Sequence, residues 1–275
     1  MRNRLTDELA VCGLNTVFAL AENHPEQINR LFLREDRLHS FTKLCKSLAE
    51  RKRPYKICED EELERISKST HHQGLVAMIH LPKVEPLSQE DIEEWAQEGS
   101  VGLVLHSVEN DHNLGAMVRS AAFFDVKYIV VSEKETETRL TTSAYRIAEG
   151  GMEHVIIKSI RNTESFLKDV SRSEVNRNEA NRSNVNRSDV NRTAARQLLT
   201  IGTDIRARQR IGDLPRIIGK TRPGIALVLG NEETGLPPEV KTACSVLLRI
   251  PGTGLMESLN VAQTATLFMH RIFEL

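Results

Sequence analysis

Apolar and polar positions follow two different periods along residues 1–83, and their alternation predicts a small α/β domain. Three stretches have apolar residues at helical spacing, and three short apolar runs between them are typical of strands. The expected helices are at 8–23, 40–52 and 61–69, and the expected strands are at 28–34, 55–58 and 75–81. Pro82 ends the last run, because proline cannot donate a hydrogen bond within a sheet.

The segment 84–99, VEPLSQEDIEEWAQEG, differs from both of its neighbours in charge. It holds six carboxylates and neither lysine nor arginine. We interpret it as an acidic linker with one or two helical turns around Trp95, the only tryptophan of the chain.

From residue 100 onward the strand-like runs are more apolar. Near-continuous apolar strands that alternate with helices are typical of a parallel sheet covered on both faces. The expected strands are at 101–108, 128–132, 154–160, 198–204, 225–230 and 246–250. The expected helices are at 114–124, 143–150 and 163–170, with a last helix at the end of the chain. The pattern over residues 100–275 therefore predicts a second α/β domain with a mostly parallel sheet.

A low-complexity insertion at 171–195 interrupts this pattern. Residues 173–192 are four copies of a five-residue unit, SEVNR, NEANR, SNVNR and SDVNR. Five residues fit neither the helical nor the strand period, so we interpret the repeat as a disordered surface insertion. Its four arginines against three acidic residues give a net charge of 4 − 3 = +1, which leaves open an arginine-bearing arm that contacts a phosphate backbone.

Composition limits the class of protein. The 275 residues are 40% apolar and 27% charged, with no apolar run long enough to span a membrane and no secretory signal at the N-terminus, so we expect a cytoplasmic protein. The four cysteines are scattered, which favours free thiols over a zinc site. A net charge of −1 gives nucleic-acid binding no support, but it leaves room for a local basic patch.

Three polar loops follow strands of the predicted sheet, where ligands of parallel sheets bind. The first, SVENDHNLGAMVRSAAFF (107–124), enters a helix for which Asn113 is the expected N-cap. Arg119 follows among small apolar residues, so its side chain extends either to solvent or into a cleft. His112 is the one conventional base in the three loops.

The second loop, LVLGNEETGLPPEV (227–240), follows the most apolar strand. Gly230 permits close backbone approach, and Asn231-Glu232 lies where a ligand would bind. The alternative is a plain turn before a helix, in which Pro237 and Pro238 mark the first helical turn.

The third loop, RIPGTGLMESLN (249–260), contains Gly252 and Gly254 and leads into the last helix. Ser258 and Asn260 straddle the start of that helix, and either could cap it. The loop lacks the third glycine of a dinucleotide fingerprint and no strand follows it. The chain also has no P-loop and no nucleophile elbow, so an ordinary nucleotide-dependent enzyme is a weak alternative.

In this order and spacing, the three loops resemble the signature motifs of the SpoU/TrmH family, RNA ribose methyltransferases of the SPOUT superfamily. The matching stretches are NDHNLGAMVRSAAFF (110–124), LVLGNEETGL (227–236) and IPGTGLMESLNVAQTA (250–265). The N-terminal stretches GLNTVFALAEN, INRLFLR and HHQGLVAMI resemble the substrate-binding domain that often precedes this catalytic domain. The stretch ESLNVAQTA (257–265) favours the YfiF-like branch of this family.

The resemblance implies an RNA substrate-binding domain at 1–83 and a SPOUT methyltransferase domain at 100–275. It further implies a homodimer, a deep trefoil knot at the C-terminal end, S-adenosylmethionine as cofactor, and rRNA or tRNA as substrate. The implied cofactor-binding residues are Leu229, Gly230, Ile250, Gly254 and Leu259. The implied catalytic residues are Asn113, Arg119, Glu232, Ser258 and Asn260.

The family's candidate activator is Arg119. A guanidinium is a poor literal base because its pKa is above about 12. We therefore expect Arg119 to bind an adjacent phosphate and to stabilise the developing alkoxide, while the other polar residues orient it and the ribose.

Several positions depart from the family pattern. Asp111, Asp125 and Gly252 replace a common proline, glycine and methionine, and Ala262-Gln263 replaces a Ser-Val pair. Gly252 and Gln263 change the surroundings of the cofactor and of the dimer contact. A non-catalytic RNA-binding protein on the same scaffold is therefore the second hypothesis.

Overall fold

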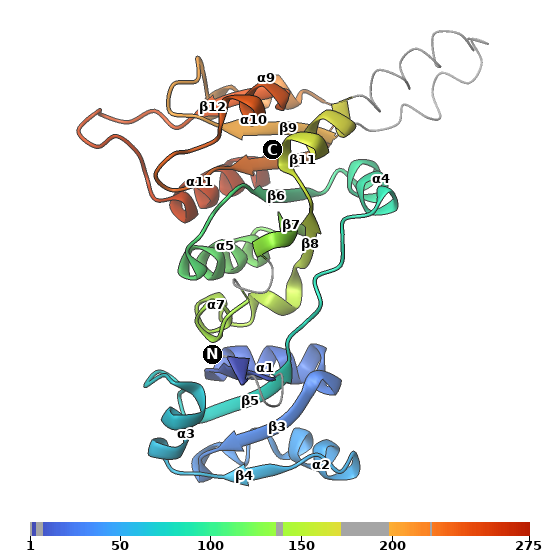
Figure 1. Cartoon of the computed structure of the whole chain (residues 1–275), viewed down its shortest axis with the longest axis vertical. Helices are drawn as coiled ribbons and strands as arrows, with labels where there is room; N and C mark the ends of the chain where they lie inside the picture. Colours follow the sequence, from blue (N-terminus) through green and yellow to red (C-terminus); the bar gives the residue numbers. More distant parts are fainter. Residues whose placement is uncertain (1, 4–7, 136–139, 172–197, 221) are drawn as a thin grey trace, which may run out of the picture. The chain divides into compact units, whose positions relative to one another are not determined.

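The computed structural model describes residues 2–3, 8–135, 140–171, 198–220 and 222–275 (Figure 1). The pentapeptide repeat at 173–192 lies outside these residues. The chain forms two compact units that are discontinuous in sequence. The first unit is made of Met1–Lys83, Asn110–Phe123 and Glu137–Val155, and the second of Val84–Glu109, Phe124–Thr136 and Ile156–Leu275.

The sheet of the first unit has five strands in the order β1-β2-β5-β3-β4. Its strands are β1 (Arg2–Asn3), β2 (Glu8–Cys12), β3 (Ile28–Leu33), β4 (Tyr55–Ile57) and β5 (Leu75–His80). Strand β5 pairs antiparallel with both β2 and β3, whereas β3 and β4 are parallel. One cluster of buried side chains joins β2 and β5 to α3 (Asp60–Ser67), with Leu63 of the helix fully buried.

The prediction of one helix over 8–23 is wrong in its first half. Glu8–Cys12 form β2, and only Leu14–Asn23 form a helix, α1. All five residues of β2 are buried, and a continuous apolar run of this length fits a buried strand as well as a helix. The break is at Gly13, whose φ of 103° favours glycine.

The other helices of the first unit come from two parts of the chain. They are α2 (Thr42–Glu50), α3, α5 (Asp111–Phe123), α7 (Thr142–Ala148) and the short 3₁₀ helix η4 (Gly151–His154). Helix α5 lies close against α7, because a Cβ added to Gly115 would come within 2.6 Å of the Ala144 carbonyl oxygen. Helix α1 contacts α7 as well, and Thr16 Oγ1 donates to the Tyr145 carbonyl at 3.4 Å.

The sheet of the second unit has seven strands in the order β10-β12-β9-β11-β6-β7-β8, and all of its pairs are parallel. Its strands are β6 (Val101–Leu105), β7 (Tyr128–Ser132), β8 (Ile156–Ile160), β9 (Leu198–Thr203), β10 (Gln209–Arg210), β11 (Gly224–Leu229) and β12 (Val246–Arg249). The prediction of an α/β fold with a mostly parallel sheet is confirmed. Figure 1 shows the late strand β11 between the late strand β9 and the earlier, green strand β6.

Helices of the second unit connect these strands. They are α4 (Gln89–Glu98), a helix at 163–171, α9 (Leu214–Ile218), α10 (Pro238–Ala243) and α11 (Val261–Phe273). Pro238 is the first residue of α10, as in the alternative interpretation of the second loop, whereas Pro237 is the N-cap and lies outside the helix. No helix in the described part of the chain has the length and apolar character needed to cross a bilayer.

The acidic segment contains more helix than we expected. Helix α4 has ten residues and begins with a capping box, in which the Ser88 hydroxyl accepts from the Asp91 N–H and the Asp91 carboxylate accepts from the Ser88 N–H. Trp95 is completely buried, stacks on Tyr128 at a centroid distance of 5.0 Å and donates from Nε1 to the Ser100 carbonyl. The segment is therefore part of the core of the second unit.

Lysines of the second unit neutralise much of the acidic charge of α4. Lys127 Nζ lies 2.9 Å from Glu94 Oε1 and 2.7 Å from Glu98 Oε2. Lys158 Nζ lies 3.0 Å from Asp91 Oδ2. The six carboxylates of 84–99 are thus explained in part by ion pairs within this unit.

Candidate active site

The three polar loops leave the sheet of the second unit at the same edge. In the parallel register, Leu229 of β11 lies opposite Leu105 of β6, and Val228 lies opposite Gly202 of β9. Leu248 of β12 lies opposite Thr203 of β9. The carboxyl ends of these strands therefore meet, as ligand binding in a parallel sheet requires.

The loop after β11 is fixed by the side chain of Asn231. Its Oδ1 accepts from the N–H groups of Glu233 and Thr234 at 3.0 and 3.1 Å and from Thr234 Oγ1 at 3.2 Å. Its Nδ2 donates to the Ser107 carbonyl at 2.9 Å, in the loop after β6. One amide thus shapes the second loop and fastens it to the first, a contact that no local sequence pattern indicates.

Gly230 permits close backbone approach, but the backbone that approaches belongs to the same turn. An added Cβ would lie 2.4 Å from the Gly235 carbonyl carbon and 2.5 Å from the Leu236 nitrogen. Asn231 and Gly235 form an isolated antiparallel bridge that closes this turn. The glycine is therefore required by the turn itself, whether or not a ligand binds.

The residues around this turn present main-chain atoms more than side chains. Leu229 is fully buried, so its side chain faces the core, while its carbonyl accepts from the His106 N–H at 2.8 Å. Glu232, which follows Asn231 in the turn, is half-buried. Ile250 is also half-buried, directly after β12.

The third loop is exposed over residues 251–260. Gly254 has a φ of 85°, and a Cβ added to Gly252 or Gly254 would meet no atom within 4 Å. Leu255 and Met256 are 89% and 80% exposed, values that are high for side chains of this size. The loop thus offers open main chain and unpacked apolar side chains.

Asn260, and not Ser258, caps the last helix. Asn260 Oδ1 accepts from the Ala262 N–H at 2.8 Å, at the start of α11. Ser258 is exposed in the preceding loop. Leu259, between them, is 47% exposed.

The prediction that Asn113 caps the first-motif helix is wrong. Helix α5 begins at Asp111, and Asn110 occupies the capping position, where its Oδ1 accepts from the His112 N–H at 2.8 Å. Asn113 lies in the first turn of the helix and is buried. Asn110 is as good a cap residue as Asn113, and it lies three residues before the predicted cap.

Arg119 lies on α5 in the first unit, with an exposed side chain. Its Nη1 is 3.1 Å from Glu149 Oε1. Of the five predicted catalytic residues, Asn113 and Arg119 belong to the first compact unit, and Glu232, Ser258 and Asn260 belong to the second.

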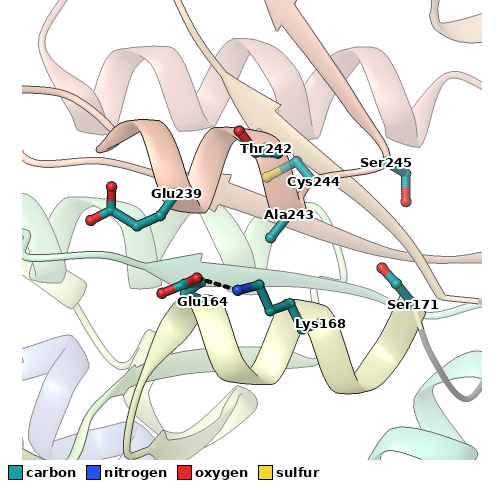
Figure 2. A pocket seen from close by; sticks show the side chains of 8 residues that line it. All are labelled: Glu164, Lys168, Ser171, Glu239, Thr242, Ala243, Cys244 and Ser245. Atoms are coloured by element: carbon teal, nitrogen blue, oxygen red, sulfur yellow. Dashed lines mark hydrogen bonds and ion pairs between the residues drawn. The ribbon is translucent and has the colours of Figure 1, made fainter.

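A separate pocket of about 580 Å³ lies in the second unit, between the helix at 163–171 and α10 (Figure 2). Its lining residues are Glu164, Lys168, Ser171, Glu239, Thr242, Ala243, Cys244 and Ser245. Lys168 pairs with Glu164, and burial raises the pKa of the Cys244 thiol to about 12, so the lysine is neutralised and the thiol is a poor nucleophile. None of these eight residues is a predicted site residue.

Two family models match the chain. The model of the SpoU rRNA Methylase family matches residues 100–270, and the model described as "RNA 2'-O ribose methyltransferase substrate binding" matches residues 10–84. The chain belongs to the SpoU rRNA methylase family. The loops after β6, β11 and β12 all lie within the part matched by the SpoU model.

Relatives of this SpoU chain match it over almost its full length. A 23S rRNA (guanosine-2'-O-)-methyltransferase RlmB of Nitrosomonas europaea is 27% identical over 98% of this chain and 92% of the relative. An uncharacterized tRNA/rRNA methyltransferase YfiF of Escherichia coli O157:H7 is 26% identical over 95% of this chain and 67% of the relative. The two identities are almost equal, so they support the family and not one branch.

The fold of this SpoU chain is shared by solved structures. An AdoMet-bound rRNA methyltransferase from Sinorhizobium meliloti superposes with a TM-score of 0.69 at 19% identity, over 98% of this chain and 87% of that chain. The structural similarity covers residues of both compact units of this chain.

Proposed function

We propose that this chain transfers a methyl group from S-adenosylmethionine to a ribose 2′-hydroxyl of ribosomal or transfer RNA. The observation that carries the proposal is the presence of both family models on one chain, the RNA-binding model at 10–84 followed by the methylase model at 100–270. The names of the relatives agree in chemistry, since the RlmB protein is named as a guanosine 2'-O-methyltransferase.

The residues present fit a bent, sulfonium-bearing cofactor. The third loop offers open main chain at Gly252 and Gly254, and exposed apolar side chains that could cover an adenosine. Turn 230–235 leaves the sheet at the same edge, and the Asn231 side chain holds its shape. Main-chain groups of Leu229, Gly230, Ile250, Gly254 and Leu259 would hold the cofactor.

The reaction needs a ribose oxygen that lies in line with a methyl carbon and loses its proton. When bound, S-adenosylmethionine supplies an electrophilic methyl group on a sulfonium. Positioning of the two partners can lower the barrier by about 7–11 kcal/mol in favourable cases. The chain's contribution is therefore chiefly to orient the RNA and to stabilise charge.

Arg119 would carry the second of these tasks. Its guanidinium would bind a phosphate next to the target ribose and stabilise the negative charge that develops on the 2′-oxygen. Asn113, Glu232 and Asn260 are proposed to orient the reacting groups, and Ser258 is the fifth residue that the family resemblance implies for catalysis. The exposure of Arg119 supports this role, since an exposed side chain can reach a large substrate.

The C-terminal part is proposed to be knotted and to form a homodimer. The sheet order supports a non-sequential path, because β11 is inserted between β9 and β6 while β12 lies on the other side of β9. Exposed apolar side chains on the last loop and helix support a contact with a second copy. They are Leu255, Met256, Leu259, Leu267 and Phe273.

The proposed domains are the RNA substrate-binding domain at 1–83, the acidic linker at 84–99 and the SPOUT methyltransferase domain at 100–275. The ranges of the two family models support this division of the sequence. Helix α4 of the linker packs with the methylase sheet, since Trp95 shares its core cluster.

The test is methyl transfer by the full chain. We expect label from tritiated S-adenosylmethionine to enter rRNA or tRNA prepared from cells that lack the gene, in alkali-resistant dinucleotides that mark 2′-O-methylation. Arg119→Ala should lower the rate by about 100-fold or more. Arg216→Ala, which removes an exposed arginine of α9, should leave it unchanged.

Two results would reject the enzyme assignment. One is the absence of both cofactor binding and transfer to either RNA class. The other is full complementation of a gene deletion by Arg119→Ala, which would favour the non-catalytic RNA-binding protein.

A further inference from the structure

Glu149 has an uncommon backbone conformation at the C-terminal end of α7. Its φ and ψ are 47° and 44°, and its N–H donates to the Arg146 carbonyl at 3.3 Å. This left-handed conformation at the end of a helix favours glycine or asparagine, and other residues adopt it at a cost in free energy. A glutamate at this position therefore calls for an explanation from its side chain.

The two glycines after Glu149 pack its main chain between α1 and α5. A Cβ added to Gly150 would lie 2.7 Å from Ala19 Cβ and 3.1 Å from the Asn15 carbonyl oxygen, both on α1. A Cβ added to Gly151 would lie 3.1 Å from the Val118 carbonyl oxygen on α5. The position of Glu149 relative to these two helices is thus fixed by backbone contacts on both sides.

The side chain of Glu149 uses one oxygen toward each helix. Oε1 lies 3.1 Å from Nη1 of Arg119, on α5. Oε2 accepts from Nδ2 of Asn15, on α1, at 3.4 Å. One carboxylate thus connects the predicted activator of the methylase motif to a helix that lies within the region matched by the RNA-binding family model.

We propose that Glu149 is a positioning residue for Arg119, which holds the guanidinium in the orientation that receives the RNA and ties that orientation to α1 of the N-terminal domain. The inference rests on the proposed function, because it takes Arg119 to act on RNA. A guanidinium has five N–H donors in a rigid fork, so a contact through one of them restricts the side chain and leaves donors for a phosphate. Less rotamer entropy is then lost when RNA binds.

The competing interpretation is a surface ion pair that only adds stability. The Arg119 and Glu149 side chains are 59% and 42% exposed, and such pairs contribute little to folding. A purely stabilising ion pair predicts that Glu149→Ala lowers the free energy of unfolding and leaves kcat unchanged. A positioning role predicts a loss of kcat that disappears when Arg119 is absent.

The experiment is a double-mutant cycle on kcat for transfer to rRNA from cells that lack the gene. Glu149→Ala should lower kcat about two- to fivefold, the range that an exposed ion pair can supply, with the Kd for S-adenosylmethionine unchanged. Glu149→Gln keeps an oxygen acceptor toward Arg119, so its kcat should stay close to that of the original chain. In the Arg119→Ala background, Glu149→Ala should cause no further loss.

The matched control is Glu164→Ala, which removes another exposed ion pair, that with Lys168, and should leave kcat unchanged. The proposal is overturned if Glu149→Ala has no effect on kcat or has the same effect in both backgrounds. If Arg119→Ala itself retains full kcat, the proposed function of Arg119 fails first, and the two failures are thereby told apart.

A spectroscopic measurement gives a result even in the absence of activity. In the full chain without RNA, the ¹H–¹⁵N signal of the Arg119 guanidinium, assigned by its loss in Arg119→Ala, should shift in Glu149→Ala. It should stay near its original position in Glu149→Gln. An unchanged signal in Glu149→Ala would overturn the proposal.

Discussion

The Asn231 side chain donates from Nδ2 to the Ser107 carbonyl at 2.9 Å and thereby joins the loop after β11 to the loop after β6. The same side chain accepts three hydrogen bonds within its own turn. This one residue therefore sets both the shape of the second motif loop and its distance from the first.

Asn231→Ala removes all four bonds. We expect the affinity for S-adenosylmethionine to fall about tenfold or more, because the loop proposed to hold the cofactor loses its shape, and stability to fall by about 1–3 kcal/mol. Titration calorimetry and urea unfolding measure the two quantities. Thr234→Val is the control, since it removes a single bond to Asn231 Oδ1, and a loss of affinity as large as that of Asn231→Ala would contradict the prediction.

The contact between Gly102 and Trp95 gives a prediction for stability. A Cβ added to Gly102 would lie 2.3 Å from Trp95 Cζ2, in a fully buried environment. Gly102→Ala should therefore destabilise the protein by about 1–3 kcal/mol. Gly212→Ala is the matched control, because its Cβ would meet no atom within 4 Å, and Trp95 fluorescence reports unfolding of both variants in urea. Equal midpoints for the two variants would contradict the packing argument.

All four cysteines are free. Burial raises the pKa of Cys12 and of Cys58 to about 11 and that of Cys244 to about 12, and it also raises the pKa of Cys45. Because the thiolate is the reactive form, the native protein should react slowly with iodoacetamide at pH 7.5 and rapidly once unfolded. Peptide mass spectrometry resolves each site, and native-state labelling of a cysteine at the rate of a free thiol would show that site to be open.

Glu153 should make stability depend on pH. Burial raises the pKa of its carboxyl group, while nearby His24, at 3.8 Å, lowers it. Because the folded pKa lies above the unfolded value, the folded state binds more protons in the window between them, and the free energy of unfolding falls as pH rises through it.

Glu153→Gln removes that titration. The stability of the variant relative to the original chain should therefore increase from pH 4 toward pH 8, as measured by urea unfolding at each pH. A difference that stays constant or declines over this range would show that the carboxyl group does not titrate in this way.

Local patterns predicted many elements of the fold and fewer of their relations. The run at 128–132 is β7 to the residue, because its β-branched residues favour a strand. The run at 8–12 fits either a strand or a helix, and the contacts with β5 that decide between them come from 64–72 residues away. The order of strands in a sheet depends on which strands pair with each other, and the period of apolar residues along the sequence does not specify those pairs.

The candidate site shows the same limit. The three motif loops could be predicted because each consists of neighbouring residues, and the parallel sheet explains why they leave the same edge. The contacts of Asn231 with Ser107 and of Glu149 with Arg119 could not be predicted, because the partners are distant in sequence. An asparagine in a turn and a glutamate at a helix end carry no local sign of such a partner.

The pairing of β6 with β11 has a consequence for synthesis of the protein. Residues Val101–Leu105 take their neighbour from Gly224–Leu229, so the ribosome must add about 120 more residues before that neighbour exists, which takes on the order of ten seconds. Until then one apolar edge of the nascent sheet has no permanent partner, and such edges recruit other chains. Chaperone binding to nascent chains, followed by ribosome profiling, should therefore be strongest between the emergence of β6 and that of β11.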